Sequence, residues 1–203
     1  IPVIEKIIEQ KPEAVISIDT TKSLVAKEAL NAGAKIVNDI SGGTFDKNIL
    51  RIVSDFNAAF VIMHIKGTPK SMQQNPYYDD VVSEVYDYLS ERVEEADKAG
   101  IKNIFIDPGI GFGKRIQDNY ELLKRLDEFK SIGYPILIGL SRKSFIGKTL
   151  SKNVDERDNP TAIAETIAVK NGARIVRTHN VKNAVEAKKI INFVNNPEQF
   201  IND

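Results

Sequence analysis

The run AFVIM at residues 59–63 is followed by VVSEVYDYLSERVEEADKA at 81–99 and by IFI at 104–106. Both short runs are apolar on their two faces, which is typical of strands buried in a parallel sheet. The segment between them has the spacing of an amphipathic helix, and Asp79 and Asp80 stand where they can cap its N-terminus. Its apolar face comprises Val81, Val82, Val85, Tyr88, Leu89 and Val93. This stretch therefore predicts a strand–helix–strand unit.

The same alternation extends in both directions along the chain. Glycines at positions 33, 100 and 172 stand where the intervening helices should end. The pattern predicts an α/β fold with a parallel sheet, either a barrel or an open doubly wound sheet. The further predicted strands are Val15–Ile18, Ile36–Val37, Ile136–Leu140 and Ile175–Val176.

The length of the chain bears on which barrel it could form. A complete eight-unit βα barrel takes about 250 residues, whereas this chain has 203 residues and six predicted strands. The sequence starts at Ile1 within an amphipathic stretch. We therefore expect residues 1–203 to form a single barrel domain that lacks roughly two βα units of about 30 residues each at its N-terminal side.

Composition excludes several classes of function. Lys plus Arg and Asp plus Glu both number 28, so no excess of positive charge is available to hold nucleic acid or an anionic membrane. The sequence has no cysteine, which excludes disulfides and thiolate metal sites and fits a reducing cytoplasm. No apolar run approaches the ~20 residues of a membrane-spanning helix.

Polar residues follow every predicted strand. Because the carboxyl ends of parallel barrel strands meet at one face, we expect these residues to surround one active-site mouth. Helix capping explains any one of them equally well, but not all six together. They are Asp19-Thr-Thr, Asn38-Asp-Ile-Ser-Gly-Gly, His64-Ile-Lys-Gly-Thr-Pro, Asp107-Pro-Gly-Ile-Gly-Phe-Gly-Lys, Ser141-Arg-Lys-Ser and Arg177-Thr-His-Asn.

Two nucleotide-binding motifs and one metal site are disfavoured by spacing. Gly147-Lys-Thr has Arg142 where a P-loop requires its first glycine. Gly109, Gly111 and Gly113 do not have dinucleotide-site spacing and instead suit a backbone that approaches a flat ligand closely. His64 and His179 lack an evident third partner, so a histidine-based metal site is disfavoured.

Several of these segments together resemble the dihydropteroate synthases, in that family's order and over essentially the whole chain. The resemblance implies a TIM (β/α)8 barrel of which strands three to eight are present. The matching segments are Ser17-Ile-Asp-Thr, Ile36-Val-Asn-Asp-Ile-Ser-Gly-Gly, Met63-His-Ile-Lys-Gly-Thr-Pro, Asn75-Pro-Tyr-Tyr-Asp-Asp, Ile106-Asp-Pro-Gly-Ile-Gly-Phe-Gly-Lys, Gly139-Leu-Ser-Arg-Lys-Ser-Phe-Ile-Gly and Val176-Arg-Thr-His-Asn.

The resemblance implies a transferase of folate biosynthesis. Such an enzyme condenses 6-hydroxymethyl-7,8-dihydropterin pyrophosphate with p-aminobenzoate, giving 7,8-dihydropteroate and pyrophosphate, and is a sulfonamide target. It also implies pterin contacts: Asp107 accepts hydrogen bonds from the amino-pyrimidinone edge of the pterin, and Arg177 stacks on the ring, which lysine cannot copy. The full implied pterin set is Asp19, Asn38, Met63, Asp107, Phe112, Lys143 and Arg177.

The second substrate and the leaving group complete the implied site. Lys143, Ser144 and Phe112 are expected to contact p-aminobenzoate, and Arg177 with His179 to hold the pyrophosphate. Lys143, Arg177 and His179 are the expected catalytic residues. Mg²⁺ is the expected cofactor, with its protein ligand outside this sequence, and the expected assembly is a homodimer.

Two features of the family pattern are not in this sequence: an Asn that contacts magnesium and pyrophosphate, and a Thr-Arg-Pro loop over p-aminobenzoate. If the molecule begins at Ile1, we expect it to lack synthase activity. A non-catalytic pterin-binding remnant is one alternative. A pterin-dependent methyltransferase module is another, because such methyltransferases share the pterin-pocket pattern. Asn180 also stands where most relatives have Asp, in a position that suits a helix cap.

Overall fold

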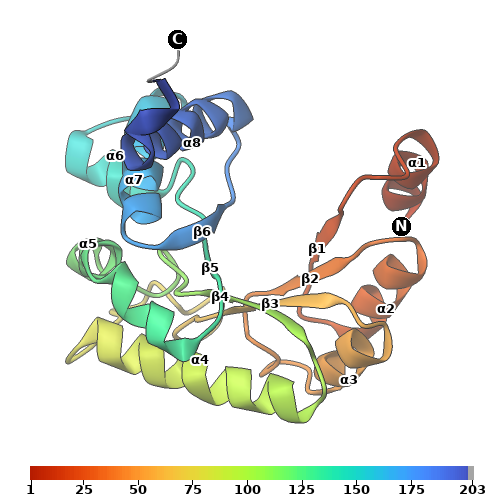
Figure 1. Ribbon diagram of the computed structural model, residues 1–203. Helices are drawn as coiled ribbons and strands as arrows, with labels where there is room; N and C mark the ends of the chain where they lie inside the picture. Colours follow the sequence, from red (N-terminus) through yellow and green to blue (C-terminus); the bar gives the residue numbers. More distant parts are fainter. Residues whose placement is uncertain (201–203) are drawn as a thin grey trace.

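Six parallel strands form one sheet in the computed structural model, which describes residues 1–200 without the side chains of residues 199 and 200. Strands adjacent in the chain are adjacent in the sheet, so the sheet winds in one direction and does not reverse as a doubly wound sheet does. Figure 1 shows it curling, with the helices on its outer side. The strands are β1 (Ser17–Asp19), β2 (Ile36–Asp39), β3 (Ala59–Met63), β4 (Asn103–Asp107), β5 (Ile136–Ile138) and β6 (Ala173–Val176).

Eight α-helices accompany the strands in the described part of the chain. They are α1 (Pro2–Gln10), α2 (Ser23–Asn31), α3 (Asn48–Asp55), α4 (Val81–Lys98), α5 (Ile116–Lys124), α6 (Ser144–Leu150), α7 (Asp158–Lys170) and α8 (Val181–Asn195). Short 3₁₀ segments cover Leu126–Ile132, Val154–Glu156 and Pro197–Phe200. None of the helices within residues 1–200 has the length and apolarity needed to cross a bilayer.

The predicted element boundaries hold for α4 and β3 and shift elsewhere. Asp80 caps α4 by accepting from the backbone N–H groups of Val82 and Ser83, whereas Asp79 instead accepts from the Tyr77 hydroxyl. The strand predicted at residues 15–18 begins two residues later, and Val15 is exposed. The strand predicted at 136–140 ends at Ile138, because the chain turns there and the Lys143 N–H bonds back to the Leu140 carbonyl.

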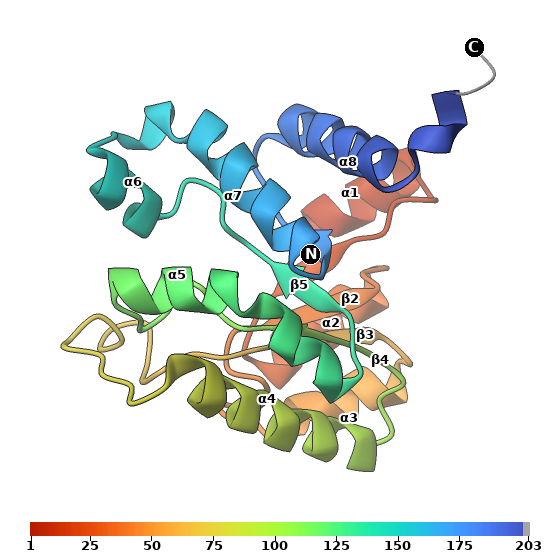
Figure 2. The same cartoon turned by 60° about the vertical axis from the view of Figure 1, so that its left-hand side comes forward.

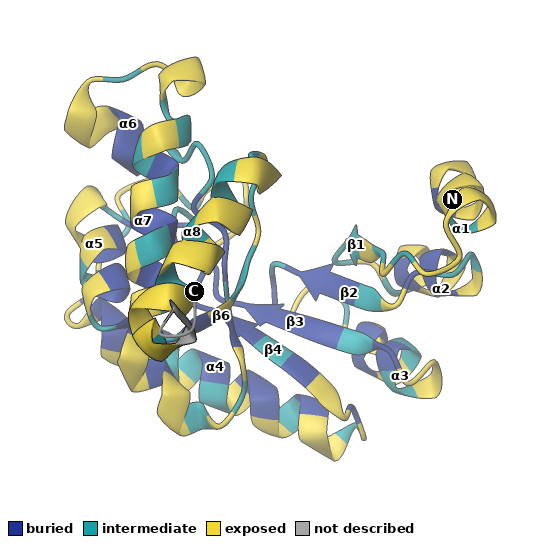
Figure 3. Cartoon of the chain, turned by 45° about the horizontal axis from the view of Figure 1, so that its top comes forward, coloured by how far each residue is buried: buried dark blue, intermediate teal, exposed yellow. Residues whose placement is uncertain are grey.

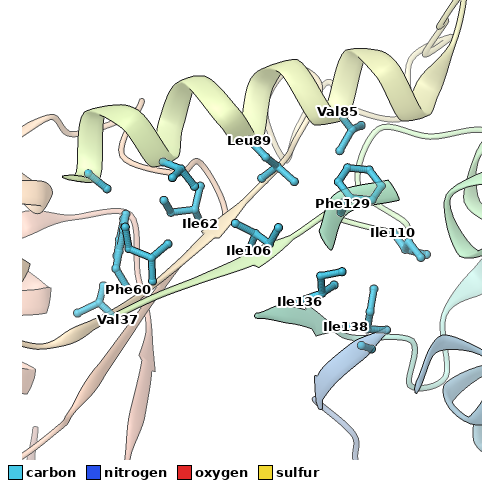
Figure 4. Packing of buried hydrophobic residues seen from close by; sticks show 14 of the residues in the cluster. Val37, Phe60, Ile62, Val85, Leu89, Ile106, Ile110, Phe129, Ile136 and Ile138 are labelled. Atoms are coloured by element: carbon cyan, nitrogen blue, oxygen red, sulfur yellow. The ribbon is translucent and has the colours of Figure 1, made fainter. Parts of the chain in front are cut away.

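The hydrophobic core lies between the outer face of the sheet and the helices. Every second residue of a strand points to the outer face of the sheet. On that face Val37, Phe60, Ile62 and Ile106 are fully buried. Helix α4 covers them with its buried apolar stripe (Figure 4). Figure 3 shows the buried sheet and the exposed outer surfaces of the helices.

The remaining strand residues, which alternate with those of the outer face, point to the concave side of the sheet. Every strand contributes to the lining of a hollow of about 460 Å³, and its floor includes Ser17, Ile36, Val61, Phe105, Leu137 and Ile175. β1 and β6 are the two edges of the sheet. The hollow is therefore an incomplete barrel interior that opens between these edges.

Candidate functional site

The sheet register brings four of the expected site residues to one end of the hollow. Asp19 pairs with Asn38 across β1 and β2, and Met63 pairs with Asp107 across β3 and β4. Asn38 in turn pairs with Val61, two residues before Met63. Because strand side chains alternate with a period of two, all four lie on the concave face. Asp19 and Asn38 form one layer, and Met63 and Asp107 form the next layer towards the carboxyl ends.

Asp19, Asn38 and Arg177 form a connected polar group across the two edges of the sheet. The Asn38 amide donates to Asp19 Oδ1 at 2.8 Å, and Arg177 Nη1 donates to Asp19 Oδ2 at 2.7 Å. Both side chains of the ion pair are more than half exposed. Arg177 directly follows β6, so this contact joins residues 158 positions apart. An exposed ion pair of this kind is weak and can open to admit a ligand.

Asp107 is a buried carboxylate at the end of β4. Its side chain is 7% exposed, and Oδ1 accepts from the Gly109 N–H at 2.7 Å. Burial raises the pKa of Asp107, while Lys143, the Gly109 N–H, Lys114 and Arg177 oppose that rise. The site thus surrounds a desolvated acceptor with positive charge, an arrangement suited to accepting hydrogen bonds from a ligand.

Lys143 approaches the loop that follows β4 from the end of β5. Its Nζ donates to the Ile110 carbonyl and lies 4.9 Å from the centre of the Phe112 ring. Its side chain lies over Gly111, where a Cβ would stand 3.0 Å from Lys143 Cδ. Burial lowers the pKa of Lys143 to about 8, because Asp107 offsets only part of the effect. The structure therefore brings Asp107, Phe112 and Lys143 together.

His179 lies apart from Arg177 although only one residue separates them in the sequence. Its backbone N–H and Nδ1 both lie within hydrogen-bond distance of Ser141 Oγ, at 3.1 and 2.8 Å. Arg177 instead pairs with Asp19. Ser144 is exposed at the first residue of α6, next to Lys143. The expected joint pyrophosphate contact of Arg177 and His179 is not preformed in these side-chain positions.

His64 pairs with a lysine and not with further side chains that could bind a metal ion. Its Nδ1 lies 2.9 Å from Lys114 Nζ, and both side chains are buried. Within residues 1–200 no three His, Cys, Asp or Glu side chains group closely enough to hold a metal ion. Sequence reasoning assigned no role to Lys114 or to Ser141, the partner of His179. The only signal was their position within the strand-end segments.

The arrangement as a whole combines hydrogen-bonding groups with cations at the mouth of the hollow. Asp107 and Asn38 offer a carboxylate and an amide at one side of the mouth, and Lys143 and Arg177 offer two cations. Asp19 restrains Arg177.

Comparison with known proteins agrees with this geometry. The family model described as "Pterin binding enzyme" matches residues 1–179. The chain is 43% identical over 192 residues to a dihydropteroate synthase of Haemophilus influenzae, an alignment that covers 94% of this chain and 69% of that protein.

Solved structures give the same result. A dihydropteroate synthase from Stenotrophomonas maltophilia, with imidazole bound in its active site, is 41% identical with a TM-score of 0.92, covering 96% of this chain and 74% of that one. The Xanthomonas albilineans enzyme in complex with 7,8-dihydropteroate is 36% identical with a TM-score of 0.89, covering 96% and 72%.

Proposed function

The chain belongs to the pterin-binding enzyme family, among its dihydropteroate synthases, and we propose that the concave mouth binds a pterin pyrophosphate and p-aminobenzoate. The reaction of this family is a transferase step in folate synthesis. The observation that carries the assignment of the site is the buried Asp107 carboxylate, which has an N–H donor on one oxygen and three cations nearby.

Asp107 is proposed to bind the amino-pyrimidinone edge of the pterin. That edge presents two N–H donors in line, and a carboxylate can accept both at once. Burial makes such a pair stronger than it would be in water. Asn38 adds a donor and an acceptor for neighbouring ring nitrogens, and Met63, which is buried, is proposed to line the pocket. Asp19 holds the Asn38 amide in position.

Arg177, His179 and Lys143 are proposed to act on the leaving group and the ring. In the described arrangement Arg177 is held by Asp19 at 2.7 Å. A pyrophosphate group would compete with Asp19 for this guanidinium, since phosphate also accepts two parallel N–H bonds. His179 would exchange Ser141 for a phosphate oxygen in the same way. Support for this assignment comes from the position of Arg177 and His179 in the loop after β6, where barrels commonly bind phosphate.

The chemical step is displacement at the exocyclic methylene of the pterin. The bond from that carbon to the pyrophosphate oxygen breaks, and the pyrophosphate leaves with the electron pair. The p-aminobenzoate nitrogen, neutral at pH 7, forms the new carbon–nitrogen bond and then releases its proton to water. The contribution of Arg177, His179 and Lys143 is electrostatic stabilisation of the departing negative charge.

Phe112 and Lys143 are proposed to contact p-aminobenzoate, together with the exposed Ser144. The Lys143 ammonium lies 4.9 Å from the centre of the Phe112 ring, so a cation and an aromatic ring stand together where an aromatic acid could contact both. The Xanthomonas albilineans relative binds 7,8-dihydropteroate, which contains both the pterin and the p-aminobenzoate parts.

Magnesium remains a proposal for the pyrophosphate end of the site. The side chains present do not fit a protein-held ion, because the described residues contain no grouping of three or more His, Cys, Asp or Glu.

The finer architecture and assembly are likewise proposals. We propose that residues 1–203 form one domain, whose six strands correspond to strands three to eight of an eight-stranded barrel, and that the protein works in the cytoplasm as a homodimer. Helices α7 and α8, which pack together (Figure 2), support the dimer because they expose Ile163, Ile167, Ile190 and Val194.

Calorimetric titration with 6-hydroxymethylpterin pyrophosphate tests the site. Asp107→Asn keeps the size of the side chain and an acceptor for the Gly109 N–H, but it replaces one carboxylate oxygen with a donor. We expect the affinity to fall about 100-fold, as for a lost charged hydrogen bond with an opposed donor. The matched control Asp87→Asn, on the exposed face of α4, should bind like the wild type. Equal affinities in all three proteins would refute the assignment.

A further inference from the structure

Lys114 is a buried lysine whose Nζ lies within hydrogen-bond distance of three groups. Its side chain is 4% exposed, and Nζ lies 2.9 Å from the Gly109 carbonyl, 3.1 Å from the Phe112 carbonyl and 2.9 Å from His64 Nδ1. The two carbonyls belong to the loop that follows β4, and His64 belongs to the segment after β3. Lys114 therefore joins the two loops beside the candidate pterin pocket.

His64 can serve as an acceptor for this lysine only when its ring is neutral. Burial, with further contributions from Lys114 and Lys66, lowers the pKa of His64 to about 2. The ring is also packed edge-on against Tyr88, with centroids 4.9 Å apart, and its backbone N–H donates to the Asp107 carbonyl at 3.0 Å. A neutral imidazole with its proton on Nε2 leaves Nδ1 free to accept from an ammonium.

The loop held by Lys114 is the one that presents Asp107 and Phe112. Gly109 donates its N–H to Asp107 Oδ1 at 2.7 Å and gives its carbonyl to Lys114. Phe112 gives its carbonyl to Lys114 and turns its ring towards Lys143. A shift of Lys114 would consequently move both the acceptor at the pterin edge and the aromatic wall.

We propose that Lys114 is a positioning residue of the pterin site: its buried ammonium fixes the loop carrying Asp107 and Phe112 and keeps the Asp107 carboxylate in its acceptor form. The inference rests on the proposed function, since it concerns the same pocket. It adds a residue that touches no substrate and acts through Gly109, Phe112 and the charge on Asp107.

The surrounding charges explain how the two roles are linked. Lys143, Lys114 and Arg177 face Asp107 and favour its ionised form against the effect of burial. The pKa of Lys114 lies well below that of a free lysine, because burial, Lys143 and Lys66 lower it by more than Asp107 and Asp118 raise it. Removing the Lys114 charge would therefore raise the pKa of Asp107 further, and pterin binding would be lost at a higher pH on acidification.

Lys114→Met tests both roles, because it keeps an unbranched side chain and removes the charge and the donors. The probe is 6-hydroxymethylpterin pyrophosphate, titrated by calorimetry from pH 5 to pH 9, with Lys124→Met on the exposed side of α5 as the matched control. We expect affinity at pH 7.5 to fall about tenfold or more and the acid limb of the profile to move to higher pH. Wild-type affinity in a folded Lys114→Met protein, or a uniform loss with an unmoved acid limb, would overturn the proposal.

A second measurement needs neither the variant nor the ligand. The sequence has two histidines, so ¹⁵N chemical shifts of the ring nitrogens are readily assigned with a His179→Gln protein. We expect His64 to carry its proton on Nε2 from pH 5 to pH 8. A proton on Nδ1 would mean that Lys114 is a neutral amine and would overturn the proposal, even if Lys114→Met fails to fold. Absence of pterin binding in the wild type would instead refute the proposed function and leave this result intact.

Discussion

Lys143 is the site residue whose charge changes with pH in the range of ordinary assays. Its pKa lies at about 8, because burial disfavours the ammonium. Only the charged form can attract a pyrophosphate or carboxylate group, so we predict that ligand affinity declines as the pH rises through about 8. Lys143→Arg should remain charged and remove this alkaline limb, although its larger head group lowers the affinity at pH 7. Calorimetric titrations from pH 6 to pH 10 measure the effect, and an identical limb in both proteins would contradict it.

His64 should make the protein less stable in acid. Its pKa is about 2 when folded and about 6.5 when unfolded, so below pH 6.5 the unfolded chain binds a proton that the folded chain excludes. Stability is therefore lost as the pH falls from 6.5 towards 2, by about 3 kcal/mol at pH 4.

Comparison with His64→Asn isolates this contribution from those of the carboxylates. The asparagine oxygen can replace Nδ1 as the acceptor for Lys114, and asparagine does not titrate. Urea unfolding at pH 7 and pH 4 should show a smaller loss in the variant than in the wild type. A loss of equal size would mean that His64 is protonated in the folded state.

The sequence allowed prediction of the residues at strand ends but not of their partners. Asp19, Asn38, Met63 and Asp107 lie on one face because strand alternation and parallel register follow from the sequence pattern. The contact between Lys114 and His64 links positions 50 residues apart. It depends on how two loops fold over each other, for which the sequence contains no periodic signal.

At Gly109, in the loop after β4, the backbone packs closely against the backbone of another loop. Gly109 has φ +67°, and a Cβ there would lie 1.8 Å from the His64 carbonyl oxygen. Gly133 has φ +91° but nothing within 4 Å of such a Cβ. Both glycines have a positive φ, but only Gly109 lies against another part of the chain. Comparing them therefore distinguishes the effect of steric crowding from the effect of backbone conformation.

We predict very different effects of alanine at the two glycines. Gly133→Ala should cost about 1–2 kcal/mol of unfolding free energy, the usual penalty of a left-handed conformation. Gly109→Ala should cost about 4 kcal/mol or more, because the loop must move away from His64. Thermal unfolding of both variants measures the difference, and similar melting temperatures would contradict the close approach.

The limits of α4 were predicted better than those of most strands. α4 has a capping Asp80, an apolar stripe and a glycine after its last turn, so three independent signals agree on its limits. The strands β1 and β5 are three residues long, and hydrogen bonding to their neighbours decides where they end. These hydrogen bonds form only in the assembled sheet, so the sequence of one strand does not determine where it ends.

At the scale of the molecule, the order of the strands decided between the two predicted architectures. A barrel and a doubly wound sheet share the same alternation of elements, and only the spatial order β1 to β6 distinguishes them. The sequence pattern alone left both open, whereas the resemblance to a known family favoured the barrel.

The exposed apolar faces of α7 and α8 are the proposed dimer interface. We predict that Ile163→Glu combined with Ile190→Glu converts a dimer into monomers, because it places charges on the exposed apolar faces of α7 and α8. Val3→Glu, at an exposed apolar position on α1, is the control and should leave the assembly unchanged. Sedimentation velocity measures the masses. A double variant that sediments like the wild type would exclude these faces as the interface.

The proposed function requires a pterin to bind with its amino-pyrimidinone edge on Asp107. A crystal structure of the protein with 6-hydroxymethylpterin pyrophosphate would show whether it does. We predict that the Asp107 carboxylate accepts two hydrogen bonds from that edge, that Asn38 contacts the ring, and that Arg177 has left Asp19. A pterin bound outside the concave mouth, or bound there with its edge turned away from Asp107, would contradict the proposed function.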